Sequence, residues 1–157
     1  MDMGDLVLSA DTATFVRDLV RGACVNETIA AAEASLQAEG VASARLKSAL
    51  QKMGEDEGRH AALGWRTLAW MLAREPSLTI VAEQALATYG APPDTHESEG
   101  LSEWGILDAS EHRALHREIL RSVVRPLFEA VVDAASTNET PLSRNRNSAP
   151  TELYDRL

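Results

Sequence analysis

The residues of this chain that could do chemistry interrupt an apolar helical pattern. The stretch "EDEGRH" contains Glu57 and His60, three residues apart, inside a run whose flanking positions carry Leu and Met at helical spacing. Residues three apart share one face of a helix, so this carboxylate and this imidazole can approach the same ion. A charged side chain on an apolar face is unfavourable without a partner, and a bound cation is one such partner.

Glu27 interrupts the apolar stripe of an earlier helical run. If the chain reverses direction near residue 41, Glu27 and Glu57 differ in height by about 3 Å, from the rise per residue of an α-helix. We therefore expect Glu27 to face Glu57 and His60 across a helical hairpin. The neighbouring positions have small side chains that leave room for an ion, namely Ala23, Ala30 and Gly64.

A simpler interpretation also accounts for these residues. Glu57 can be a solvated carboxylate at the edge of a helix, and His60 a neutral histidine at the boundary of the core. We expect His112 and His116, four residues apart, to lie on a charged, solvent-exposed helix face. No basic neighbour activates Cys24, which favours a buried structural thiol. Aromatic side chains at helical spacing are typical of a core, as at Trp65 and Trp70.

The elements that must position these residues are all helical. Aromatic residues make up only 4% of the chain, Ala and Leu are abundant, and no sustained alternation of apolar and polar residues occurs. The pattern predicts an all-α fold with an antiparallel hairpin. The expected helices cover residues 12–39, 43–74, 77–90 and 110–136, the last kinked or divided at Pro126 because proline lacks a backbone donor.

The chain length favours one main domain with less ordered ends. Residues 1–11 are expected to form an N-terminal extension, and 12–74 the hairpin. Residues 75–136 are expected to supply additional helices, with a surface loop near 90–109. The polar, proline-containing segment 137–157 is expected to be a disordered tail.

Charge and cysteine content limit the class of partner and compartment. The formal net charge is −9, which disfavours nucleic acid and anionic membrane surfaces as partners. Cys24 is the only cysteine, so an internal disulfide is excluded and a reducing compartment is favoured. We find no pattern typical of a secretory signal or a transmembrane helix and expect a cytoplasmic protein.

Two segments resemble a known family. "ACVNETIAAAEAS", followed by "GEDEGRHAALGWRTLAW", is similar to the ferritin-like di-iron carboxylate superfamily, and most to bacterial ferritin-like domain-containing proteins, over residues 12–74. In that superfamily a four-helix bundle holds two irons through single glutamates and Glu-x-x-His motifs. The resemblance implies that Glu27, Glu57 and His60 are metal ligands. It also implies that Asp56 hydrogen-bonds the histidine of an opposing motif.

The chain has one Glu-x-x-His motif where a single-chain member has two, so it resembles the C-terminal half of such a protein. A homodimer would complete the set and give a di-iron, or di-manganese, centre with ferroxidase-type oxidoreductase chemistry. The alternative is a metal-free helical interaction module, the remnant of a longer ferritin-like protein.

Overall fold

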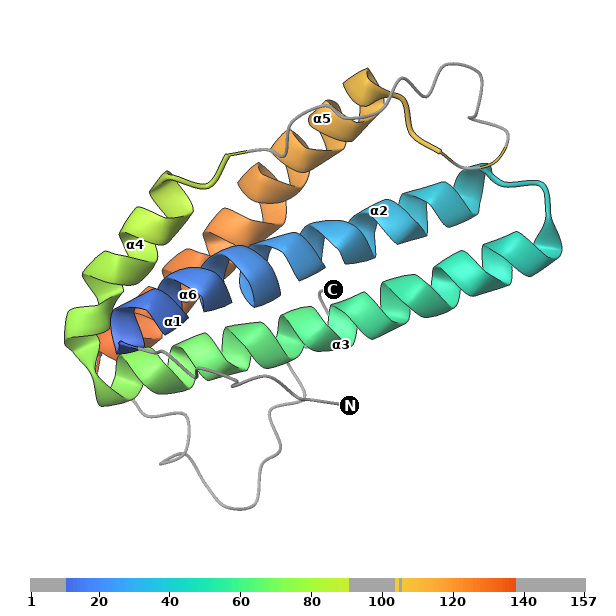
Figure 1. Ribbon diagram of the computed structural model, residues 1–157. Helices are drawn as coiled ribbons and strands as arrows, with labels where there is room; N and C mark the ends of the chain where they lie inside the picture. The colour runs from blue at the N-terminus through green and yellow to red at the C-terminus, as the bar shows by residue number, and fades with distance from the viewer. Residues whose placement is uncertain (1–10, 91–103, 105, 138–157) are drawn as a thin grey trace, which may run out of the picture.

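The computed structural model describes residues 11–90, 104 and 106–137, and no strand occurs among them (Figure 1). The prediction of an all-α fold is therefore confirmed for this part of the chain. The predicted tail beyond residue 137, most of the loop near 90–109 and the first ten residues lie outside the described residues.

The first helical run is continuous, but its middle part is a π-helix instead of an α-helix. It begins at Asp11, whose carboxylate accepts a hydrogen bond from the backbone N–H of Thr14 at 2.8 Å and so caps the helix. A π-helical segment then separates two α-helices, which the sequence did not predict. The three segments are α1 (Thr12–Leu19), η1 (Val20–Asn26) and α2 (Glu27–Gly40).

The second run, α3 (Ala44–Arg74), returns alongside the first. Ser43 caps its start by accepting a hydrogen bond from the backbone N–H of Leu46 at 3.4 Å. Three residues, 41–43, connect α2 to α3, so the two helices run antiparallel and side by side (Figure 1). The predicted bounds of 12–39 and 43–74 agree with the observed ones to within one residue.

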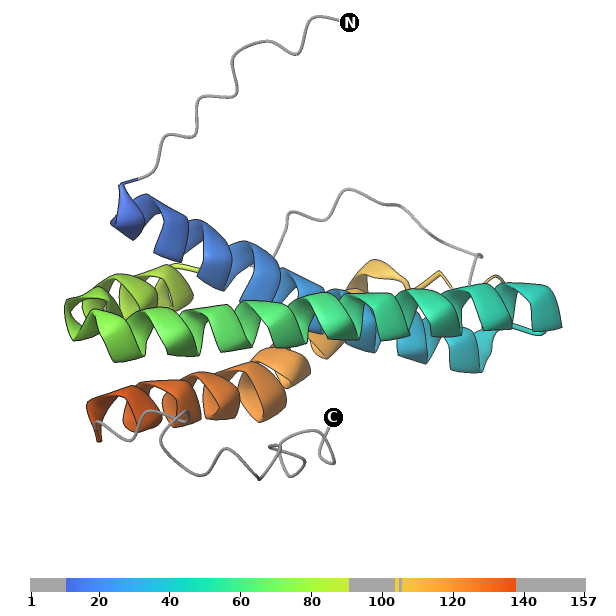
Figure 2. The ribbon, with the colours of Figure 1, turned by 90° about the horizontal axis from the view of Figure 1, so that it is seen from below.

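The remaining helices pack around this hairpin. A short 3₁₀ turn, η2 (Pro76–Leu78), leads into α4 (Thr79–Ala87), which packs against α1 and η1. Helix α5 (Ala109–Ile119) contacts α2, and α6 (Arg125–Ser136) contacts α3, as Figure 2 shows from below. Between them lies a second π-helical segment, η4 (Leu120–Val124). The predicted division at Pro126 corresponds to the boundary between η4 and α6.

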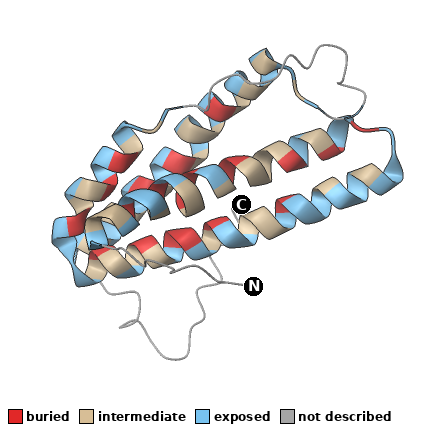
Figure 3. Ribbon diagram, viewed as in Figure 1, coloured by how far each residue is buried: buried red, intermediate tan, exposed pale blue. Residues whose placement is uncertain are grey.

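The hydrophobic core lies where all these helices meet (Figure 3). Its fully buried members come from α1, η1, α3, α4 and η4 and include Val16, Val20, Cys24, Leu68, Leu72, Ala82 and Val124. The first ten residues of α3, by contrast, are all exposed or half-buried. The core therefore encloses one end of the hairpin, whereas at the other end the residues of α3 are not buried.

Two residues expected in the interior are on the surface of α3. Met53, an apolar residue of the expected stripe, is 44% exposed, and Trp70 is 51% exposed. The buried side of α3 includes Gly64 and Leu68, as the apolar pattern predicts, but passes through Gly54 and Ala61 instead of Met53 and His60, because α3 packs on both α2 and α6. Trp65 is in the core as predicted.

Candidate metal centre

The approach of α3 to the first helical run brings the candidate ligands together. A Cβ atom added to Gly64 would lie 2.7 Å from the backbone and Cβ of Ala23. One added to Gly54 would lie 3.1 Å from Ser35 Oγ and 3.2 Å from the carbonyl oxygen of Ala31. These two glycines let the helices pack closely above and below the level of Glu27.

Glu27, Glu57 and His60 converge between these two contacts. Nδ1 of His60 is 3.2 Å from Oε2 of Glu57 and 3.9 Å from Oε2 of Glu27. One ligand atom from each of the three residues lies within 4.8 Å of the others. The juxtaposition expected from the hairpin register is therefore present, and the three side chains can reach a common ion.

The two carboxylates affect each other's ionisation. The interaction with Glu57 is the largest cause that raises the pKa of Glu27, and burial and the charge of Glu57 add to it. The pKa of Glu57 is lowered by its interactions with Glu27 and His60. Two carboxylates this close repel each other, and a positive charge between them relieves the repulsion. A cation bound there would favour the charged form of both.

Glu27 directly follows the π-helical segment η1. A π-helix fits more residues into each turn than an α-helix, so it shifts the angular position of every residue that follows. Such segments occur often at functional sites. Here the shift sets the direction from which Glu27 meets α3.

The cluster is open to solvent on one side. The side chains of Glu27 and Glu57 are about one-third exposed, and that of His60 is 63% exposed. An ion held here would keep coordination positions that these three residues do not fill. Asp56, which the resemblance pairs with an opposing histidine, forms an ion pair with Arg59 of its own helix.

A second group of possible ligands was missed by the sequence analysis. His116 is buried, and His112 lies half-buried beside Glu33 of α2, so the expectation that both histidines are solvent-exposed is wrong. The apolar pattern Leu115, Ile119, Val123 and Leu127 predicts which side of the α5–α6 run is buried. The buried residues are instead His116, Val124 and Phe128, one position later. The four-residue spacing of the two histidines was the available signal.

Burial affects the two remaining groups of interest. Burial lowers the pKa of His116, and the neighbouring His112 adds to this effect. Cys24 is fully buried, as expected, and burial raises the pKa of its thiol to about 12. The thiol is therefore neutral and closed to solvent, so Cys24 has a structural role.

Comparison with known proteins adds no assignment: no family model, curated protein or solved structure matches the chain. None of the described helices is both long and apolar enough to cross a lipid bilayer.

Proposed function

We propose that the chain is a ferritin-like metal-binding protein whose Glu27, Glu57 and His60 form half of a di-iron or di-manganese centre. Pairing of two chains would complete it. The observation that carries the proposal is the convergence of these three side chains from two helices, with one ligand atom of each within 4.8 Å of the others.

The donor set fits such a metal. Two carboxylates and one imidazole form a mixed oxygen and nitrogen set of the type that iron and manganese accept. The repulsion between Glu27 and Glu57, which raises the pKa of Glu27, marks a place where positive charge is favourable. A divalent ion between them would leave both carboxylates charged and paired.

The incomplete ligand set supports pairing of two chains. Three side chains do not fill the coordination shell of an iron ion, and the open side of the cluster faces solvent. In the ferritin-like arrangement two such hairpins supply four carboxylates and two imidazoles to two metals. A two-fold axis beside His60 would bring the second set from an identical surface.

Exposed apolar residues flank the cluster on α3. Met53 is 44% exposed, Leu63 is 55% exposed and Trp70 is 51% exposed. Met53 lies seven residues before His60, whereas Leu63 lies three residues after it and Trp70 ten residues after it. At these spacings they lie along the side of α3 that carries His60, away from the chain's own core. We call this set the α3 stripe, and propose that it packs against a second copy.

Bound iron would supply the electrons that reduce dioxygen or a peroxide. The part of this chain is to hold the metal through Glu27 and Glu57, with the imidazole of His60 as a terminal ligand. Burial of the cluster between two hairpins would exclude bulk water. The substrate would then be limited to small species that reach the metal.

A metal-free interaction module is the second candidate. The observation in its favour is the α3 stripe, since an apolar face of this kind is typical of a protein contact whether or not metal is present. In that case solvent and His60 are sufficient to offset the repulsion between Glu27 and Glu57, and a partner covers the stripe without metal.

Iron content measured together with molecular mass distinguishes the two candidates. Purified protein is incubated anaerobically with excess ferrous iron, desalted, and analysed by elemental analysis and by chromatography with light scattering. We expect the Glu57→Gln variant to bind about one iron ion fewer per chain and to be monomeric. The substitution removes the charge of the carboxylate but keeps the shape of the side chain.

The matched control is Glu55→Gln. Glu55 is exposed on the same helix two residues earlier and belongs to neither ligand cluster. It should keep both the iron and the dimer. A monomer that binds no Glu57-dependent iron in excess metal would rule out the di-iron proposal and favour the interaction module.

A further inference from the structure

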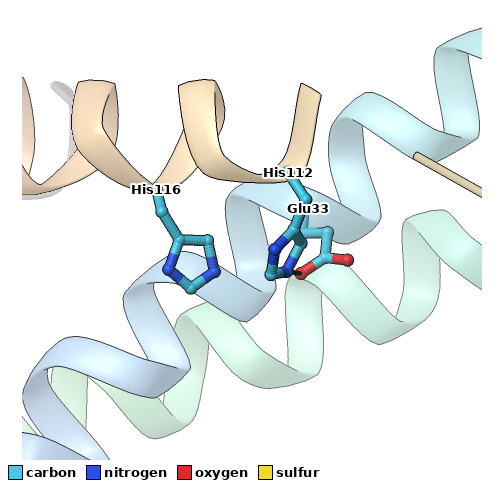
Figure 4. Close-up of side chains that lie close together, drawn as sticks. All are labelled: Glu33, His112 and His116. Atoms are coloured by element: carbon cyan, nitrogen blue, oxygen red, sulfur yellow. Dashed lines mark ion pairs between the residues drawn. The ribbon is translucent and has the colours of Figure 1, made fainter. Parts of the chain in front are cut away.

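A second cluster of metal-binding side chains lies on the other side of α2 (Figure 4). Glu33 projects from α2 toward α5, and His112 and His116 project from successive turns of α5 (Figure 4). They line a cavity of about 540 Å³ between α2, α5 and the end of α4. Neither residue of the α5 pair takes part in the centre formed by Glu27, Glu57 and His60.

The distances within this cluster allow a common ligand. Nε2 of His112 is 3.4 Å from Oε2 of Glu33, and the two imidazole rings have centroids 4.3 Å apart. One ligand atom from each of the three residues lies within 4.8 Å of the others. Histidines four residues apart on a helix project in the same direction, which is the usual way that a helix supplies two imidazoles to one metal.

The burial of His116 is costly without a ligand. The side chain is buried, with 4% of the residue exposed, and its Nδ1 atom has no hydrogen-bond partner among the described residues. Buried polar groups are almost always satisfied, so an unsatisfied buried imidazole calls for a specific explanation. A metal ion bound at Nδ1 would provide one, because it would satisfy this atom and leave the ring proton on Nε2.

We propose that Glu33, His112 and His116 form a mononuclear site for a divalent transition metal of the Zn²⁺ class. Two imidazoles and one carboxylate are a ligand set that zinc uses with a fourth, open position. That position would face the cavity, which Arg21, Asn26 and Tyr89 also line. All three ligands come from one chain, so this site does not depend on pairing of two copies.

Hydrogen bonds order the surroundings of the cavity. Gln37 donates to Oε1 of Glu33 at 3.1 Å, which leaves Oε2, the oxygen nearest His112, available to a metal. The hydroxyl of Tyr89 donates to Oδ1 of Asn26 at 2.7 Å, and Arg21 donates to Oγ1 of Thr88 at 2.8 Å. These contacts join the end of α4 to η1, on the side of the cavity away from Glu33. A metal would join α2 to α5 on the other side.

Nuclear magnetic resonance of the imidazole groups tests the site directly. The chain has four histidines, so each can be followed separately during titration of the full chain with Zn²⁺ alone. We expect one equivalent of Zn²⁺ to shift the signals of His112 and His116 first. Titration with Co²⁺ should give visible absorption bands typical of a low-coordinate site.

Two variants and one control complete the experiment. His112→Gln and Glu33→Gln change half-buried residues and should each weaken Zn²⁺ binding at least tenfold, with helical content unchanged by circular dichroism. Glu57→Gln should leave this affinity unchanged, because Glu57 belongs to the other cluster. If the proposal of a dimeric iron centre is wrong, the outcome of the Zn²⁺ titration is therefore unaffected.

The proposal is overturned if Zn²⁺ shifts His60 before His112 and His116, or if His112→Gln binds Zn²⁺ as tightly as the unmodified chain. In either case the contact between His112 and Glu33 is only an ion pair that holds α5 against α2.

Discussion

The thiol of Cys24 gives the fold a pH dependence at the scale of one residue. Because burial raises its pKa to about 12, the folded chain keeps the proton at a pH where the unfolded chain has lost it. This contribution to stability is fully present below about pH 9 and is lost as the pH rises toward 12. The free energy of unfolding should fall by about 1.4 kcal/mol per pH unit across this window.

Denaturant titrations at several pH values between 8 and 11 measure this slope, and Cys24→Ala is the control. The variant loses stability by a constant amount, from the removed sulfur atom, but should lack the thiol contribution to the pH dependence. Equal slopes for the two proteins would mean that the folded chain ionises Cys24 as readily as the unfolded chain does.

The sequence predicts the position of some residues in the fold better than that of others. The meeting of Glu27 with Glu57 and His60 was predictable, because the position of the hairpin turn and the rise of an α-helix place these residues at the same height. The burial of His116 was not, because it depends on which side of the α5–α6 run faces the core. An error of one residue in that stripe moves a side chain by about 100° around the helix.

At the scale of elements, the sequence predicted the helix bounds but not the two π-helical segments. Segments η1 and η4 contact each other, and each lies inside a helical run that the sequence pattern treats as one α-helix. A pattern of 3.6 residues per turn assumes a constant phase along a helix, so it carries no signal for the wider turns of a π-helix. The burial of His116 and the exposure of Met53 and Trp70 have another cause, because none of these residues follows a π-helical segment in its own helix: they depend on which neighbouring helices cover each side.

Close packing of α3 on η1 predicts a strong effect of substitution at Gly64. The added methyl of Gly64→Ala would overlap Ala23, including its backbone, and backbone cannot rotate away as a side chain can. We expect destabilisation by about 1–3 kcal/mol, typical of overpacking, despite the higher helix propensity of alanine. Chemical denaturation measures this change.

Gly58→Ala is the matched control, because a Cβ atom added at Gly58 meets no atom within 4 Å. It lies in the same helix and should raise the free energy of unfolding by about 0.5–1 kcal/mol. If both substitutions were stabilising, α3 and η1 would have to lie farther apart than described here.

A buried hydrogen-bonded chain joins the same two helices. Nε1 of Trp65 donates to Oγ1 of Thr28 at 3.1 Å, and this hydroxyl donates to the carbonyl oxygen of Cys24 at 2.6 Å. Thr28→Val keeps the shape but leaves the buried indole N–H without an acceptor. We expect a loss of about 1–3 kcal/mol, measured by chemical denaturation.

Thr67→Val is the control that separates the effect of the hydrogen bond between the two helices from the effect of a hydroxyl bonded within its own helix. Thr67 also donates to a backbone carbonyl four residues earlier, at Leu63, but the structure gives it no hydrogen bond to the other helix of the hairpin. Its substitution should change stability by less than half as much. Comparable losses for the two variants would assign the effect to helix propensity instead of to Trp65.

At the scale of the whole molecule, the helices enclose one end of the hairpin and leave the α3 stripe uncovered. Leu68 and Leu72 of α3 are fully buried on the side where this helix contacts η1 and α6, whereas Leu63 and Trp70 are exposed. We expect these apolar side chains to pack against a second copy, as proposed above. The stripe adjoins the cluster of Glu27, Glu57 and His60, so covering the stripe and completing the metal centre are expected to be one event.

This coupling makes Leu63→Lys the most informative surface substitution. Leu63 is 55% exposed, so lysine is tolerated in the monomer, but two lysines at a two-fold interface would repel each other and resist burial. We expect Leu63→Lys to remain a folded monomer in excess ferrous iron and to lose the iron that depends on Glu57. Light scattering and elemental analysis on the same sample measure both.

The matched control is Ile80→Lys, since Ile80 is 62% exposed but lies on α4, and it should keep dimer and iron. Retention of Glu57-dependent iron by monomeric Leu63→Lys would show that the centre forms without pairing, and would contradict the half-site proposal.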